Sequence, residues 1–445
     1  MKKTAVLVIL IIVCIFGYFR LRNKPNPEND PITTPDVIEH TTESLFAFGM
    51  NETDFLTKYM TEAEESDQEL IEARFAAGME KADFLAIFDK EPVYLKKDNG
   101  GWNADALKYD FEAVLPYASV ENMILLLNTS AAVKVEIIGQ SLDKRNIYAI
   151  EIGFGERVIM FEAGIHAAET ANTMFIMKYI SNLVTKYEEH DSAVVSLLKD
   201  VKIIVVPSAN PDGYEATMYG YSQIRNDALY IVKNNAAISY ALYKSNAGGI
   251  DINRNFPSQH GGLYYTDYGL SNNASLGDDD YAGNTLGCEP ETQALMYWQM
   301  KHVGKAYAYI SLHSSGRVIF AGKPNLGDQF NDNCWLLANI VSDITDYWAI
   351  GPEYEDVGIG QDGTATDFVA ELAAGFKFSS TTGRLSGNHY DNPTISGNQA
   401  IGVITLETLE RYTFNISEIK EEYYGKNLEQ VFDALIKSYT KIKSS

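Results

Sequence analysis

The amino-acid sequence predicts an α/β protein with a mixed, mostly parallel twisted sheet that helices cover on both faces. The chain has 445 residues, of which 46% are hydrophobic, and this is enough for a large core. After Gly101, short β-rich runs alternate with helical or turn-rich segments, which is typical of strands covered by helices. The interval from Gly213 to Gly283 is rich in Asn, Gly, Ser and Tyr with weak periodicity, so we expect long loops above the sheet there.

The N-terminal segment, residues 1–24, has the pattern of an export signal. Two lysines precede an apolar run from Ala5 to Phe19, and three basic residues follow it: Arg20, Arg22 and Lys24. This is typical of a signal peptide or a short signal anchor. The lack of a small-x-small cleavage site favours an uncleaved membrane anchor, although a full span needs about 20 apolar residues. Both alternatives place the rest of the chain outside the cytoplasm, anchored at the cell surface or secreted, and the MKK start suggests a bacterium.

Two further segments precede the predicted sheet. Residues 25–42 are rich in Pro, Asn, Asp and Thr without apolar periodicity, and we interpret them as a linker. Residues 43–109 begin with an acidic helical pattern that extends to about Asp89. This part could be a small helical preamble, an inhibitory pro-segment or a packing collar, and the sequence leaves all three open. The predicted main domain is residues 110–445.

Six apolar runs are the predicted strands of that domain. They are residues 131–139, 147–153, 157–164, 201–210, 306–313 and 400–407. In open α/β sheets, ligands bind where strand ends meet long loops. Polar residues that directly follow these runs are therefore the first candidates for a functional site.

A histidine and a glutamate three residues apart follow one of these strands. His166 and Glu169 come after the apolar run 157–163 and before a helical pattern, so a one-turn loop can aim both side chains at one point. His313 ends another apolar strand. A catalytic zinc site needs three N or O ligands and one position open for water. We therefore predict one zinc ion per chain, held by His166, Glu169 and His313. The alternative is that the two histidines are ordinary hydrogen-bonded core residues.

A bound zinc ion polarises a carbonyl and lowers the pKa of its bound water, but such a site still needs a general base. Glu407 ends the buried-looking strand 400–407, and a carboxylate at such a strand end can be tuned for proton transfer. The alternative is a solvated glutamate at a strand terminus. We take Glu407 as the candidate base.

Composition limits the partners. The net charge of −24 argues against nucleic acid, because phosphate neutralisation needs clustered Lys and Arg. We expect a monomer whose membrane contact, if any, is through the N-terminal segment. Cys14 lies in the apolar run, so only Cys288 and Cys334 could pair, and two buried thiols are an equal alternative.

Six motifs, in order from about Tyr117 to about Tyr412, resemble those of the zinc metallocarboxypeptidase family, which includes pancreatic carboxypeptidases A and B and bacterial cell-surface relatives. They are GIHAAE at 164–169, SANPDGYEATMYGYSQIRND at 208–227, GIDINRNFP at 249–257, CEPETQAL at 288–295, YISLHSS at 309–315 and ITLETL at 404–409. The resemblance implies the carboxypeptidase fold. It also implies zinc ligation by His166, Glu169 and His313, and catalysis by Glu407.

The same resemblance implies residues that act on the substrate. Arg225 falls at the position of a catalytic arginine and would stabilise the oxyanion of the reacting carbonyl. Asn253 and Arg254 would hold the terminal carboxylate of a peptide. An arginine can grip a carboxylate through two parallel charge-assisted bonds, so this pair would select a chain end.

One stretch departs from the family pattern. Tyr390 is the only tyrosine available as the mobile lid residue of the family, but it lies closer to Glu407 than the family spacing expects. If SGNHYD instead matches the pocket motif, Tyr390 or Asp391 lines the side-chain pocket and the lid tyrosine is missing. Arg384 could favour an acidic substrate from the same stretch, or it could be a surface loop arginine.

These features predict a zinc carboxypeptidase that removes C-terminal residues from peptides. A peptidase of γ-D-glutamyl or diaminopimelate bonds in peptidoglycan stems is the main alternative, motivated by Arg384 and by export. An N-acyl amino acid deacylase shares the zinc ligands but fits the NPDG and DINRNF motifs less well. A binding module without activity is disfavoured because the set of candidate site residues is complete.

Overall fold

The computed structural model confirms the predicted mixed sheet covered by helices. It describes residues 92–97, 101–225, 240–257, 281–283, 287, 289–323, 326–351, 363–373, 377–379, 384–386 and 400–442. Within these ranges, all six predicted strands are present at or within a few residues of their expected bounds. Residues 1–91, which hold the predicted signal segment, the linker and most of the predicted preamble, lie outside the described part, as do Cys288 and Tyr390.

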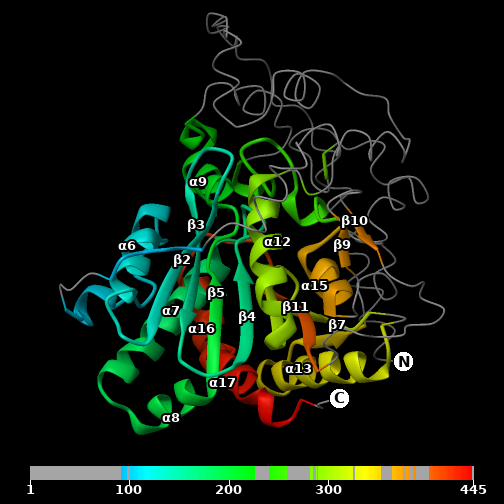
Figure 1. Cartoon of the computed structure of the whole chain (residues 1–445). Coiled ribbons are helices and arrows are strands. Elements are labelled where there is room, and N and C mark those ends of the chain that lie inside the picture. Colours follow the sequence, from blue (N-terminus) through cyan, green and yellow to red (C-terminus); the bar gives the residue numbers. More distant parts are fainter. Residues whose placement is uncertain are drawn as a thin grey trace, which may run out of the picture.

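Nine of the described strands form one sheet in the order β1-β2-β3-β5-β4-β6-β11-β7-β8 (Figure 1). Their bounds are β1 Val93–Tyr94, β2 Val133–Gln140, β3 Asn146–Ile152, β4 Arg157–Ala163, β5 Val201–Val206, β6 Ala306–Ser314, β7 Val318–Ala321, β8 Trp348–Ile350 and β11 Gly402–Thr408. The four central strands β5, β4, β6 and β11 are parallel, and the pairings on either side of them, β3 with β5 and β7 with β11, are antiparallel. Two short strands, β9 Lys377–Ser379 and β10 Arg384–Ser386, form a separate antiparallel pair.

The α-helices surround this sheet. Their bounds are α6 Tyr117–Leu127, α7 Thr170–Glu188, α8 Ser192–Asp200, α9 Pro211–Tyr219, α12 Pro290–His302, α13 Asp328–Thr345, α15 Ala365–Ala373, α16 Ile416–Gly425 and α17 Leu428–Ile436. Short 3₁₀ helices are η2 Asp105–Leu107, η3 Tyr221–Gln223, η5 Tyr240–Leu242, η6 Ile252–Arg254, η8 Val303–Lys305 and η9 Lys437–Thr440. Within the described ranges, no helix combines the length and the apolar character that a membrane crossing requires.

Neighbouring residues of β4 show that helices cover both faces of the sheet. The ring of Phe161 contacts that of Phe432 on α17, with ring centroids 5.8 Å apart. The next residue, Glu162, accepts a hydrogen bond from Tyr309, whose ring lies 6.1 Å from that of Trp298 on α12. Because successive side chains of a strand point to opposite faces, α17 and α12 lie on opposite sides of the sheet. Figure 1 shows α12 in front of the strands and α17 behind them.

The prediction of loops from Gly213 onward is wrong for residues 213–219, which belong to α9. The side chain of Asn210 caps this helix by accepting a hydrogen bond from the backbone of Gly213, and Pro211 occupies its first turn. The helix has little apolar periodicity because it buries polar and small residues, Asp212 and Gly213 among them, along with Tyr214. Its start signal was nevertheless present in the sequence as Asn-Pro.

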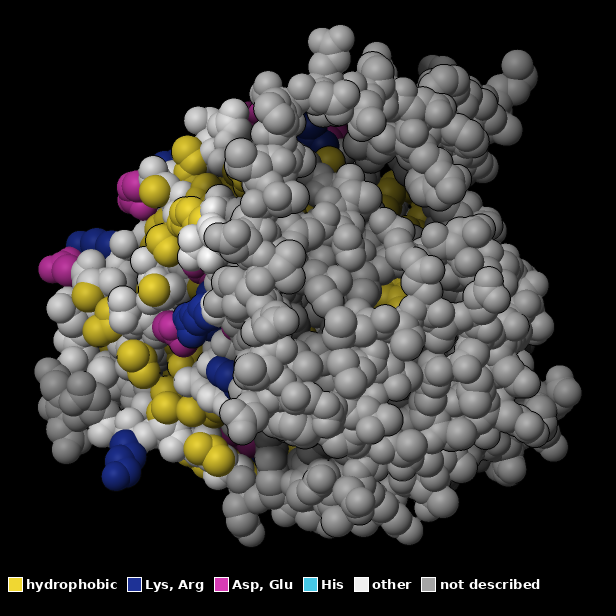
Figure 2. All heavy atoms as spheres, turned by 90° about the horizontal axis from the view of Figure 1, so that it is seen from above, with side chains coloured by type: hydrophobic (Ala, Val, Ile, Leu, Met, Phe, Trp, Pro, Cys, Tyr) yellow, Lys and Arg dark blue, Asp and Glu magenta, His cyan; other side chains and the backbone are white. Residues whose placement is uncertain are grey.

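The surface seen from above in Figure 2 is mixed in character where the structure describes it. Lys and Arg side chains alternate there with Asp and Glu side chains among apolar groups. On the N-terminal side, β1 pairs with β2, and Leu107, Tyr109 and Phe111 pack into the main hydrophobic core. The described residues that precede α6 are therefore part of the same packed unit as the sheet.

Candidate metal centre

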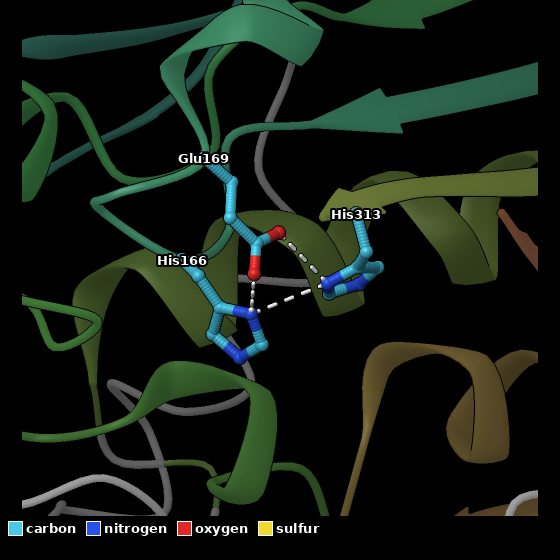
Figure 3. A group of neighbouring side chains, drawn as sticks. All are labelled: His166, Glu169 and His313. Atoms are coloured by element: carbon cyan, nitrogen blue, oxygen red, sulfur yellow. Dashed lines mark hydrogen bonds and ion pairs between the residues drawn. The ribbon is translucent and has the colours of Figure 1, made fainter. Parts of the chain in front are cut away.

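Three predicted ligands meet at the ends of two neighbouring strands (Figure 3). Nδ1 of His166 lies 2.8 Å from Oε1 of Glu169. Nδ1 of His313 lies 3.1 Å from Oε2 of Glu169 and 3.2 Å from Nδ1 of His166. All three side chains are buried. The carboxylate therefore faces both imidazole rings, and each ring presents Nδ1 to the same point.

The backbone explains why the first two residues converge. The chain leaves β4 through Gly164, whose φ of +64° and close approach to Thr173 favour glycine. The amide of Glu169 then donates to the carbonyl of His166, which closes a single turn before α7 begins at Thr170. The amide of Ala167 donates to the carbonyl of Lys244, which ties this turn to a distant loop.

The third residue comes from the neighbouring parallel strand. Ala163 at the end of β4 is in register with Leu312 of β6, so His313 extends one residue past the end of β4. The carboxyl ends of parallel strands meet at one edge of the sheet, which is where ligands bind in such folds. The pairing of β4 with β6 thus brings together two histidines that are 147 residues apart in the sequence.

The buried charges of the group stabilise one another. Burial alone would lower the pKa of His166, but the carboxylates of Glu169 and Asp251 raise it to about 9. Burial would raise the pKa of Glu169, yet the two histidines lower it to about 2. The pKa of His313 is also raised, because Glu169 outweighs the effect of burial. A positive charge at this point is therefore strongly favoured, whether protons or a metal ion supply it.

The donor set fits zinc. Ligand atoms about 2.0–2.1 Å from a tetrahedral zinc ion lie about 3.3 Å from one another, and the three distances above are close to this value. On the far side of His166, Nε2 lies 3.3 Å from Oδ1 of Asp251, a buried carboxylate. Such outer partners fix the orientation of a metal-binding imidazole. Three protein ligands are the number that a catalytic zinc site uses.

A second group of potential ligands in the described part of the chain has different surroundings. Glu136, Glu151 and His302 also bring one donor atom each within 4.8 Å of one another. However, Oε2 of Glu136 already lies 2.7 Å from the ammonium of Lys301, and Lys202 lies 3.8 Å from Glu151. Lysines therefore neutralise these carboxylates, whereas Glu169 faces two imidazoles.

The predicted base lies beside the third ligand. Glu407 of β11 is directly in register with His313 of β6, and its charge contributes to the raised pKa of that histidine. The side chain of Glu407 is half-buried. The next residue, Thr408, donates to Oδ1 of Asn172 at 2.8 Å, and its hydroxyl lies 3.1 Å from that of Ser314. These bonds fix the end of β11 against α7 and β6.

The predicted carboxylate-binding pair lies on a firmly held turn. Asn253 and Arg254 belong to η6, and both are buried. Oδ1 of Asn253 accepts from the amide of Ala365 at 3.0 Å, and Phe256 donates to the carbonyl of Gly363 at 2.9 Å. The turn that carries Arg254 is thus attached to the chain just before and at the start of α15.

Three further residues from the sequence analysis lie elsewhere in the described part of the chain: Arg225, Arg384 and Cys334. The side chain of Arg225 is exposed, and its backbone amide donates to Asp143 at 2.6 Å, in a cluster that includes Arg145 and Asp212. Arg384 is the first residue of β10, in register with Ser379, and its side chain is not among the described atoms. Cys334 is a buried free thiol whose sulfur accepts from the amide of Val403.

Two neighbours of the site were missed from the sequence. Asp251 contacts His166, and its only signal was its place within GIDINRN. Lys244 is half-buried, its charge helps to lower the pKa of Asp251, and its ammonium lies 5.9 Å from the centre of the Tyr412 ring. Nothing in the local sequence distinguishes this lysine from a solvated one.

Comparisons with known proteins agree with this geometry. A sequence model of the zinc carboxypeptidase family matches residues 122–364, more than half of the chain. The human carboxypeptidase N catalytic chain is 29% identical over 173 residues, which cover 37% of this chain and 34% of that protein. Mouse carboxypeptidase A2 is 28% identical over 221 residues, 48% of each chain. The chain thus spans about a third to a half of the length of the curated relatives.

A solved structure shows the same fold. Bovine thrombin-activatable fibrinolysis inhibitor, in complex with tick carboxypeptidase inhibitor, superposes with a TM-score of 0.51 at 18% identity. The match covers 75% of this chain and 99% of that one. The family resemblance expected from the six sequence motifs is confirmed. The chain belongs to the zinc carboxypeptidase family.

Proposed function

We propose that the protein is a zinc-dependent carboxypeptidase that hydrolyses the C-terminal peptide bond of peptides. One observation carries the proposal: Nδ1 atoms of two buried histidines and the carboxylate of Glu169 converge within 3.2 Å, with Glu407 in register beside them. Membership in the zinc carboxypeptidase family supports the same reaction class. The pattern of residues 1–24 supports export of the enzyme.

His166, Glu169 and His313 would hold one zinc ion. When bound, zinc polarises the scissile carbonyl and lowers the pKa of water towards neutrality. The protein supplies the rest of the centre. Asp251 contacts Nε2 of His166, and the pairing of β4 with β6 supports the position of His313 beside the turn that ends at Glu169.

Glu407 is our proposed proton carrier. It takes a proton from the attacking water and passes it to the leaving amine, so that one carboxylate serves as base and then as acid. Its support is positional, because the family match ends at residue 364 and Glu407 lies beyond it. The register with His313, and the hydrogen bond from the neighbouring Thr408 to Asn172, support a position of the carboxylate beside the proposed metal.

Arg254 and Asn253 would bind the terminal carboxylate of the substrate. A buried guanidinium on a rigid turn can pair with a carboxylate through two parallel hydrogen bonds. An internal peptide bond offers no such carboxylate. The enzyme would therefore remove residues from the chain end.

Two basic residues are candidates for stabilising the oxyanion that forms from the reacting carbonyl. Arg225 is the candidate by its place in the sequence motif, but its side chain is exposed. Lys244 is half-buried, and its loop is tied to the turn between His166 and Glu169 through the amide of Ala167. The placement of Lys244 favours it as the residue that stabilises the oxyanion, and the kinetics of variants at the two positions would distinguish them.

The identity of the released residue depends on the pocket. Tyr390 and Arg384 remain our proposed pocket residues, and a positive charge from Arg384 would favour acidic substrates such as peptidoglycan stem peptides. These stem peptides are the alternative substrates. Hydrolysis of ordinary peptides and of stem peptides would use the same metal group. An activity assay with both kinds of substrate is therefore needed to distinguish them.

The test compares the zinc-loaded full-length protein with Glu407→Gln on peptides of varied C-terminus and on purified muropeptides. Glu410→Gln is the matched control, because Glu410 is an exposed glutamate three residues further along. We expect residue release to fall by about 10²–10⁴-fold in Glu407→Gln alone, with one zinc per chain retained in all three proteins. Protein that takes up no zinc, or a Glu407→Gln variant with full activity, would refute the proposal.

A further inference from the structure

A continuous chain of buried polar side chains lies behind His313. Nε2 of His313 lies 2.9 Å from Oγ of Ser311. The hydroxyl of Ser311 donates to Oε2 of Glu162 at 2.9 Å, and the hydroxyl of Tyr309 donates to the same oxygen at 2.8 Å. Gln299 on α12 donates to the hydroxyl of Tyr309 at 2.9 Å. The other ring nitrogen of His313, Nδ1, faces Glu169 and His166.

The sheet itself builds this chain. Tyr309, Ser311 and His313 are alternate residues of β6 and point to the same face, towards α12. Glu162 comes from the neighbouring strand β4, where it is in register with Ser311. Glu162, Ser311 and Tyr309 are completely buried. Buried polar groups depend on their protein partners, so this arrangement is held firmly.

The direction of each hydrogen bond can be assigned. Oε2 of Glu162 accepts from both hydroxyls. A serine hydroxyl has one hydrogen, and Ser311 uses it on Glu162, so its oxygen must accept the hydrogen on Nε2 of His313. A neutral imidazole with hydrogen on Nε2 has its lone pair on Nδ1. That is the nitrogen that faces Glu169 and His166.

We propose that Ser311 and Glu162 position His313 for metal binding by fixing both its ring orientation and its tautomer. This inference rests on the proposed zinc function and deepens it. The other histidine ligand is served differently, because His166 contacts the carboxylate of Asp251 directly. Each imidazole thus has a carboxylate on the side of its Nε2 atom. Asp251 contacts His166 directly, whereas Ser311 links Glu162 to His313.

Electrostatics also connects Glu162 with the metal group. Burial raises the pKa of Glu162, and the charge of His313 is the strongest influence that opposes it, followed by the bonds from Tyr309 and Ser311. Partners of this kind raise the basicity of a ligating imidazole. Two hydroxyl groups donate to the same carboxylate oxygen, which favours the ionised form, and an ionised Glu162 would add its charge to the orienting contact.

Four variants separate these contributions. Ser311→Ala removes the bridge, so it leaves Nε2 of His313 without its partner. Glu162→Gln keeps an acceptor oxygen for Ser311 and Tyr309 but removes the charge. Its amide nitrogen can take the place of Oε1, for which no hydrogen-bond partner is described. Tyr309→Phe is the matched control, since its hydroxyl bonds the same carboxylate oxygen but does not touch His313. Ser311→Thr restores a hydroxyl.

The measurement is the zinc dissociation constant of each full-length protein, obtained by competition with a chelator, together with the melting temperature of the zinc-free form. We expect Ser311→Ala to weaken zinc binding by about 10–100-fold and Glu162→Gln by a smaller factor in the same direction. The zinc dissociation constants of Tyr309→Phe and Ser311→Thr should stay within about threefold of the parent value, because both variants leave a hydroxyl beside Nε2 of His313. Melting temperatures identify any variant that has lost its fold, and the remaining variants then decide the result.

Two outcomes would overturn the inference, and they differ from each other. Zinc binding that is equal in Ser311→Ala, Glu162→Gln and Tyr309→Phe would remove the positioning role while leaving the proposed enzyme intact. A parent protein that binds no zinc would remove both the positioning role and the proposed function.

Discussion

The position of Arg254 depends on Gly363, and this dependence can be tested by Gly363→Ala. Gly363 has a φ of +81°, and a Cβ atom added there would lie 2.7 Å from the carbonyl oxygen of Arg254 and 3.2 Å from its carbonyl carbon. A left-handed backbone costs an L-residue about 1–2 kcal/mol. Forcing extra volume against a packed backbone adds about 1–3 kcal/mol. We therefore expect Gly363→Ala to lower the free energy of unfolding by about 2–5 kcal/mol.

Gly101→Ala is the control for the backbone contribution alone. Gly101 has almost the same φ, +82°, but no atom lies within 4 Å of its added Cβ. Its substitution should cost only about 1–2 kcal/mol. Urea unfolding measures both values. Because the added methyl group displaces the turn that carries Arg254, we also expect a KM for peptide substrates about tenfold higher in Gly363→Ala and unchanged in Gly101→Ala. Equal stability losses and equal KM values in the two variants would refute this reasoning.

Three further predictions concern charge and metal. Lys244→Gln should lower kcat by about 10²-fold and Arg225→Gln by less than about threefold. The reason is that, of these two side chains, that of Lys244 is half-buried near Asp251 and that of Arg225 is exposed. Steady-state kinetics that show the reverse order would assign the oxyanion role to Arg225. Burial, and then the charge of Asp212, raise the pKa of Glu291 to about 7, so the stability that its protonated form contributes is lost as pH rises from about 4.5 to about 7. The free energy of unfolding of Glu291→Gln, relative to that of the parent protein, should thus rise by about 3 kcal/mol between pH 4 and pH 8. Urea unfolding measures this difference, and a difference that does not change with pH would contradict the raised pKa of Glu291. Removal of zinc by a chelator should lower the unfolding free energy by about 4 kcal/mol when zinc had been present at 1,000 times its Kd, and His313→Ala should show no such loss in a thermal shift assay.

The strands that could be predicted from the sequence are the long apolar ones. Runs such as 157–164 and 306–313 stand out because strands buried on both faces contain few polar residues. β8, Trp348–Ile350, is only three residues long and begins three residues after α13 ends, so no period can develop in it. α9 was missed because most of its buried residues are polar or small, so it lacks the apolar stripe that identifies a surface helix.

The site was predictable where the chemistry coincides with a strand end. His166, Glu169, His313 and Glu407 all follow or end apolar strands, and the structure brings the first three together with Glu407 beside them. Asp251 was not predictable, because its contact with His166 arises only when two distant loops pack together.

Glu162 did carry a signal in the sequence. It is a charged residue inside an otherwise apolar strand, and such a residue needs a partner in the core. Which partner it has depends on the sheet order, which places β4 beside β6. The sequence alone could therefore mark Glu162 as unusual without connecting it to His313.

The order of strands in the sheet has a consequence for synthesis of the chain. β11 is inserted between β6 and β7, although it is made long after both of them. A nascent chain that stops before β11 exposes the edges of β6 and β7 and lacks Glu407 altogether. The proposed zinc ligands can be present in such a chain, but the proposed base cannot. The proposed base would thus be in place only after β11 has been made and inserted, whereas the three proposed ligands are already part of the chain by residue 313.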